Sequence, residues 1–115
     1  MAQSDFAERI AMIRARFAAK LTDKIQDTDA ALAHLTGDGR DAVDAVAATY
    51  RRFHDICGIG ATIGFEATGQ AARAIDAILI GPFREQRALS DDELVKLTEG
   101  LVFLRSAVRT EMSST

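Results

Sequence analysis

The sequence predicts an all-α protein, an antiparallel up-and-down four-helix bundle, and three observations support that prediction. Alanine, the best helix former, occurs 21 times in 115 residues, while proline occurs once and tryptophan never. Apolar residues recur at steps of three and four along four segments, and no segment shows the strict alternation of a strand. The connections are mostly short, so each segment can bury its single apolar stripe against its neighbours in a bundle.

The first predicted helix carries the longest apolar stripe of the sequence. It begins after Ser4, a good N-cap residue, and Asp5 and Glu8 are favourably placed in its first turn. It ends at the turn-forming segment 36–39. A helix of about 30 residues would be roughly 45 Å long. The stripe that we expect to be buried consists of Phe6, Ile10, Ile13, Phe17, Leu21, Ile25, Thr28, Leu32 and Leu35.

The second predicted helix begins near residues 38–40 and weakens at a group of glycines. Gly58, Gly60 and Gly64 lower the helix propensity of this region, so we expect a tight connection around residues 61–64. The apolar stripe of this helix consists of Val43, Val46, Tyr50, Phe53 and Cys57.

Two further helices complete the predicted bundle. The third starts at about Phe65, and we expect the Gly81-Pro82 pair to end it. Its stripe consists of Phe65, Thr68, Ala72, Ile75 and Leu79. The fourth begins at a capping box, the serine and glutamate of Ser90-Asp91-Asp92-Glu93. Its stripe consists of Leu94, Leu97, Leu101, Leu104 and Val108.

Length and composition predict one soluble domain over residues 1–115 and exclude several functions. Acidic residues outnumber basic ones by 17 to 14, which argues against nucleic acid as the main partner. Apolar runs never exceed four residues, so we expect no membrane span, and the first ten residues lack the pattern of a signal peptide. The single cysteine excludes an internal disulfide and the usual cysteine-based zinc sites. We therefore expect a cytoplasmic protein.

His54 is the candidate for chemistry, because it lies at the edge of the second stripe. Successive helical residues turn by about 100°, which places His54 roughly 60° from the stripe centre. One ring face can pack there while a ring nitrogen reaches water. Its neighbours along the helix are Ala47, Arg51, Gly58 and Ala61, so most are small. A glycine within a helix costs about 1 kcal/mol relative to alanine, and the space beside the imidazole is a plausible reason for Gly58.

This segment resembles the histidine-containing phosphotransfer (HPt) domain of two-component phosphorelays. The family pattern is His-x-Leu-Lys-Gly-Ser, followed by an apolar residue and a second glycine. The sequence matches it at His54, Ile56, Gly58, Ile63 and Gly64, and the helix lengths fit over nearly the whole chain. The resemblance implies that His54 exchanges a phosphoryl group with the aspartyl-phosphate of a response-regulator receiver domain.

The sequence departs from the family pattern at two positions. Cys57 stands where the family has lysine, and Ile59 stands where it has serine. In an antiparallel hairpin facing residues have a constant index sum, so if His54 faces Asp76, then Cys57 faces Arg73. Family members often carry Glu or Gln at the position of Asp76, bonded to the histidine ring. We hypothesise that Asp76 orients His54 and that Arg73 or Arg51 replaces the lysine.

The resemblance also implies partners and the absence of a cofactor. The partners would be receiver domains and a hybrid histidine kinase, and magnesium would come from the receiver, so the chain itself needs no cofactor or metal. The chain contains neither Gly-x-Gly-x-x-Gly nor Gly-Lys-Ser/Thr, so we expect a phosphohistidine carrier without kinase activity of its own. We expect a monomer rather than a dimer, with no nucleic-acid or membrane partner.

Other interpretations of the same residues remain open. If the chain is not a phosphotransfer domain, His54 is an ordinary residue at the boundary of the core and Cys57 is a small core residue. Asp76 is then a surface carboxylate paired with Arg73, and Arg51 is a solvated charge. A second hypothesis is a degenerate HPt-like adaptor that binds receivers, or self-associates, without carrying phosphate.

Overall fold

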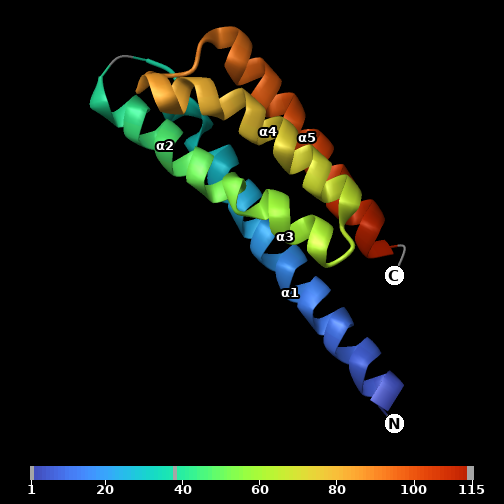
Figure 1. Cartoon of the computed structure of the whole chain (residues 1–115). Coiled ribbons are helices and arrows are strands. Elements are labelled where there is room, and N and C mark those ends of the chain that lie inside the picture. The colour runs from blue at the N-terminus through green and yellow to red at the C-terminus, as the bar shows by residue number, and fades with distance from the viewer. Residues whose placement is uncertain (1, 38, 114–115) are drawn as a thin grey trace.

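The computed structural model describes residues 2–37 and 39–113, and all regular structure in these residues is helical (Figure 1). The elements are α1 (Ala2–Ala31), the short 3-10 helix η1 (Leu32–His34), α2 (Arg40–His54), α3 (Ile56–Thr62), α4 (Glu66–Glu85) and α5 (Asp91–Ser113). The predicted all-α class is confirmed, and the helices pack against one another as a bundle. Asp38, one of the residues near which α2 was expected to start, lies outside the described residues.

Helix α4 is the central element of the bundle, because it packs against α2, α3 and α5, while α1 packs against α5 and α2. The predicted stripes of α2, α4 and α5 supply most of the core. Burial of such side chains is the main stabilising contribution, about 1.5–3 kcal/mol for each. The largest fully buried apolar residues are Phe53, Phe65, Leu21, Leu35, Ile75, Leu79, Leu97, Leu101, Leu104 and Val46.

Helix α1 departs from the prediction at its N-terminal end. It begins at Ala2, so Ser4 lies within the helix and is not its N-cap. Burial along α1 starts only at Ala18, and the preceding turns extend beyond the bundle (Figure 1). Phe6 and Ile13 were expected in the core but are exposed, because α1 has 30 residues and α2 only 15.

The second predicted helix is divided into two by a turn at Asp55, directly after His54. Helix α3 then ends before Gly64, whose φ of +88° favours glycine. A Cβ on Gly60 would lie 3.3 Å from both the Gly69 Cα and the Phe65 carbonyl oxygen. The glycines at 60 and 69 therefore allow the close approach of α3 and α4.

The expectation that the Gly81-Pro82 pair ends the third helix is wrong. Helix α4 continues to Glu85, with Pro82 buried inside its last turn. The Pro82 ring normally clashes with the Cβ of the preceding residue, and Gly81 has none. The end is set by Gln86, which has a left-handed φ of +52°, while the Arg87 N–H donates to the Pro82 carbonyl at 3.1 Å.

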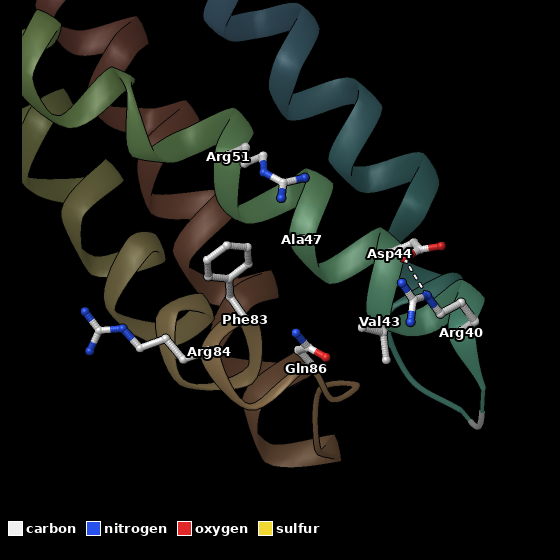
Figure 2. A pocket seen from close by; sticks show the side chains of 8 residues that line it. All are labelled: Arg40, Val43, Asp44, Ala47, Arg51, Phe83, Arg84 and Gln86. Atoms are coloured by element: carbon white, nitrogen blue, oxygen red, sulfur yellow. Dashed lines mark ion pairs between the residues drawn. The ribbon is translucent and has the colours of Figure 1, made fainter.

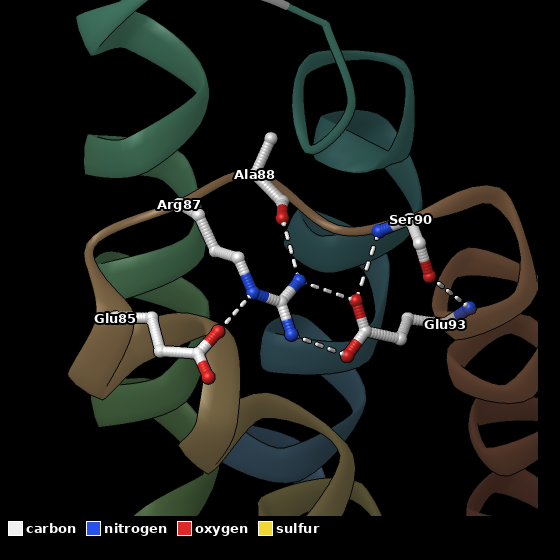
Figure 3. A network of polar contacts seen from close by, with 5 residues as sticks. All are labelled: Glu85, Arg87, Ala88, Ser90 and Glu93. Atoms are coloured by element: carbon white, nitrogen blue, oxygen red, sulfur yellow. Dashed lines mark hydrogen bonds and ion pairs between the residues drawn. The ribbon is translucent and has the colours of Figure 1, made fainter.

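The capping box predicted for α5 is confirmed and is part of a larger network (Figure 3). The Glu93 N–H donates to the Ser90 hydroxyl at 3.2 Å, and the Ser90 N–H donates to the Glu93 carboxylate at 2.9 Å. Arg87 binds the same carboxylate through two nitrogens at 2.7 and 3.0 Å, and also binds Glu85 and the Ala88 carbonyl. The hydrogen bonds from Arg87 lower the pKa of Glu93 to about 2. The network fixes the connection between α4 and α5.

Helix α4 receives its N-terminal cap from another helix. Phe65 precedes α4 and provides no side-chain cap. The Glu111 carboxylate from α5 instead accepts hydrogen bonds from the Thr68 N–H at 2.7 Å, the Ala67 N–H at 3.3 Å and the Thr68 hydroxyl. A carboxylate at this position satisfies unpaired N–H groups and interacts favourably with the helix dipole.

Candidate functional site

The candidate site is built around His54 and Asp76, which face each other from α2 and α4. The His54 side chain is 57% exposed, as expected for a residue at the edge of the stripe. The Asp76 carboxylate, only 20% exposed, lies 2.9 Å from the His54 Nδ1. The predicted facing of these two residues is therefore confirmed, and the imidazole is open to a partner.

The Asp76 contact determines which ring nitrogen is available. An ionised carboxylate can only accept a hydrogen bond, so Nδ1 of His54 carries the proton. The lone pair is then on Nε2, which no group in residues 2–37 and 39–113 hydrogen-bonds. This arrangement presents a positioned ring nitrogen at the surface, which can act as a nucleophile when its lone pair is free.

Tyr50 is a site residue that the sequence analysis placed only in the core. Its ring stacks on the His54 ring with centroids 5.2 Å apart, and its hydroxyl lies 3.3 Å from Nδ1. Tyr50 also stacks on Phe83 of α4, with centroids 4.3 Å apart. The spacing of four residues between Tyr50 and His54 could have indicated the first contact, but nothing local indicated Phe83. The two contacts limit the movement of the imidazole.

Gly58 lies one helical turn beyond His54 and is not required by packing within the chain. A Cβ at this position would meet no atom within 4 Å. Its backbone φ is not among the positive ones, so the conformation does not demand glycine either. The space beside His54 is therefore open, in agreement with the prediction.

Cys57 and Arg73 also lie together, as the hairpin geometry predicts. Both line a shallow depression of about 280 Å³ between α3 and α4. Burial raises the pKa of the Cys57 thiol, Asp76 raises it further, and the Arg73 guanidinium opposes the shift. Cys57 is therefore a neutral thiol that packs against the core, and Arg73 is the nearby exposed cation.

Arg51 lies on the other side of the site, at the edge of a basic depression of about 460 Å³ (Figure 2). Its guanidinium carbon is 5.6 Å from the centre of the Phe83 ring. Arg84 and Arg40 line the same depression, and Arg40 pairs with Asp44 at 3.4 Å. Positively charged side chains therefore extend from Arg51, one helical turn before His54, to Arg84 near the end of α4, although the chain is acidic overall.

In the part of the chain that the structure describes, no group of three or more His, Cys, Asp or Glu side chains is arranged to bind a metal ion. None of the described helices combines the length and apolar character needed to cross a bilayer. The second histidine, His34, lies in η1.

Comparisons of the chain with protein-family models, curated proteins and solved structures found no significant match. The geometry around His54 is therefore the main indication of what the chain does.

Proposed function

We propose that this chain is a phosphorelay carrier of the HPt type, a cytoplasmic antiparallel up-and-down bundle. His54 accepts a phosphoryl group from the aspartyl-phosphate of one receiver domain and passes it to another. The observation that supports this proposal best is the exposed imidazole whose Nδ1 is 2.9 Å from Asp76.

The transfer is a displacement at phosphorus. The Nε2 lone pair of His54 forms the new N–P bond while the bond from phosphorus to the donor aspartate oxygen breaks, and its electrons return to the aspartate as carboxylate. The proton stays on Nδ1, where Asp76 stabilises the positive charge that the ring gains. Delivery to the next receiver is the reverse of this step, and magnesium belongs to the receiver.

The surroundings of His54 suit a reaction that depends on positioning and charge compensation. The open space at Gly58 leaves room for the receiver's acyl phosphate. Arg51 lies one helical turn before His54, and Arg73 lines a depression together with Cys57, so each is a candidate to offset phosphate charge in place of the family's lysine. Asp76 and Tyr50 act as positioning residues for the ring.

The direct test mixes the protein with receiver domains that carry labelled aspartyl-phosphate. We expect acid-labile label on the wild-type chain and none on His54→Gln, while the matched control His34→Gln is labelled normally. Asp76→Asn should slow transfer about tenfold, the value of one charge-assisted hydrogen bond of about 1.4 kcal/mol.

Two results would contradict the proposal that the chain carries a phosphoryl group on His54. Label on His54→Gln at the wild-type level would remove the site assignment. Receiver binding without any labelling, equal in wild type and His54→Gln, would support the non-catalytic adaptor instead.

A further inference from the structure

The N-terminal half of α1 presents an apolar stripe that the chain itself leaves uncovered. Phe6 is 67% exposed and Ile13 is 47% exposed, and Ile10 lies between them on the same helix face. The stripe borders a depression of about 490 Å³, where α1 passes Met112 near the end of α5. The same face is buried further along α1, from Ala18 onward. The exposed part is therefore a continuation of a packing surface beyond the bundle that covers it.

We propose that a second copy of this chain covers the stripe, with the two α1 helices antiparallel and crossing between Arg9 and Ile10. The apolar residues are four and three positions apart, which is the seam spacing of paired helices. A two-fold axis between Arg9 and Ile10 places Phe6 of each copy opposite Ile13 of the other, so the stripe is complementary to itself. Ala7 and Ala11 flank the crossing point and allow close approach.

The charges of α1 favour this antiparallel pairing. Asp5 and Glu8 lie in the first turns, whereas Arg9, Arg14 and Arg16 follow. A crossing between Arg9 and Ile10 brings Asp5 of one copy level with Arg14 of the other, while a parallel pair would place Asp5 beside Asp5 and Arg14 beside Arg14.

Arg14 supplies a second, independent observation. Its guanidinium carbon lies 4.7 Å from the centre of the Phe65 ring, at the end of the bundle. Its Nε is buried and has no hydrogen-bond partner among the described residues, and no ion pair of Arg14 is formed there. The Asp5 carboxylate of a second copy would give the terminal nitrogens of this guanidinium a charge partner.

A second copy fits the stripe better than a lipid surface does. Membrane-surface helices carry an excess of Lys and Arg beside their apolar face. Between residues 5 and 14, two acidic residues balance two arginines, which suits a partner with the same alternation of charge. The stripe includes none of the residues around His54, so this inference does not depend on the proposed function.

The test is the mass of the protein by sedimentation equilibrium, from low micromolar to several hundred micromolar concentration. We expect the wild-type mass to rise from 12.4 kDa towards twice that value. Ile10→Asp should remain monomeric with an unchanged circular dichroism spectrum. Met12→Asp is the matched control, because Met12 is also exposed on α1 (53%) but lies off the stripe, and it should dimerise like wild type.

The orientation is tested by disulfide formation in a Cys57→Ala background. A mixture of Phe6→Cys and Ile13→Cys chains should form the mixed disulfide, whereas Phe6→Cys alone should not cross-link. A wild-type chain that stays monomeric throughout would overturn the proposal, as would equal loss of dimer in Met12→Asp and Ile10→Asp. Sedimentation of the monomer with anionic phospholipid vesicles, abolished by Ile10→Asp, would assign the stripe to a membrane surface and also overturn it.

Discussion

The substitution Gly58→Ala should raise the stability of the fold and lower its activity, because this glycine serves no packing purpose within the chain. Its Cβ would meet nothing within 4 Å, and its backbone φ is not positive. Alanine in a helix is favoured over glycine by about 0.5–1 kcal/mol, so the free energy of unfolding should increase by that amount. For a domain of this size the increase corresponds to a rise in melting temperature of roughly 2–4 °C.

The same methyl group should interfere with transfer to His54. It would stand one helical turn from the imidazole, about 5–6 Å away between Cβ atoms, where the incoming receiver has to approach. Displacing the partner by even a fraction of an ångström disturbs a near-attack geometry, and we expect at least a tenfold slower transfer.

Gly60→Ala is the matched control, since Gly60 lies in the same short helix but its Cβ would be too close to two backbone atoms at 3.3 Å. Here the gain in helix propensity is opposed by separation of α3 from α4. Gly60→Ala should therefore be less stable than Gly58→Ala by about 1–2 kcal/mol. Urea titration gives both free energies, and the labelled-receiver assay gives the rates. A Gly58→Ala chain that is stabilised and still transfers at the wild-type rate would refute the functional explanation of this glycine.

Two further predictions concern stability alone. Glu93→Gln should lower the free energy of unfolding at pH 7 by about 1–2 kcal/mol, an amount reduced for the partial exposure of its partner Arg87. Because folding lowers the pKa of Glu93 from 4.5 to about 2, this stabilisation is complete above pH 4.5 and disappears as the pH falls towards 2. Urea titrations of wild type and variant should therefore converge across that window, and a constant difference down to pH 2 would contradict the assignment. Glu111→Ala should lower the free energy of unfolding by about 1–2 kcal/mol, because α4 loses its cap, and it should also speed amide exchange at Thr68. Glu99→Ala, on an exposed part of α5, should leave both quantities unchanged.

The features predicted correctly from the sequence are those with a local or a simple geometric origin. The Ser90 and Glu93 capping box needs only residues three positions apart, so its pattern was sufficient. The placement of Cys57 beside Arg73 followed from the constant index sum of a helical hairpin, once His54 was taken to face Asp76. The exposure of His54 followed from its angle to the apolar stripe.

The features that were missed depend on contacts between distant segments. No local pattern connects Glu111 with the start of α4, or Tyr50 with Phe83, because more than thirty residues separate each pair. The exposure of Phe6 was missed for a related reason. Periodicity indicates that a helix has an apolar face, but it does not indicate how far the neighbouring helices extend to cover that face.

Tyr50 stacks on both Phe83 and His54, and this lowers the entropic cost for any molecule that binds to the His54 ring. A free histidine side chain samples several rotamers, and fixing it costs conformational entropy when a complex forms. Here the fold has already restricted the ring, through one aromatic contact with Tyr50 and one carboxylate, Asp76. A partner protein therefore encounters an imidazole whose orientation is already restricted. Differences in affinity between partners then reflect the partners' own surfaces rather than reorganisation of the His54 side chain.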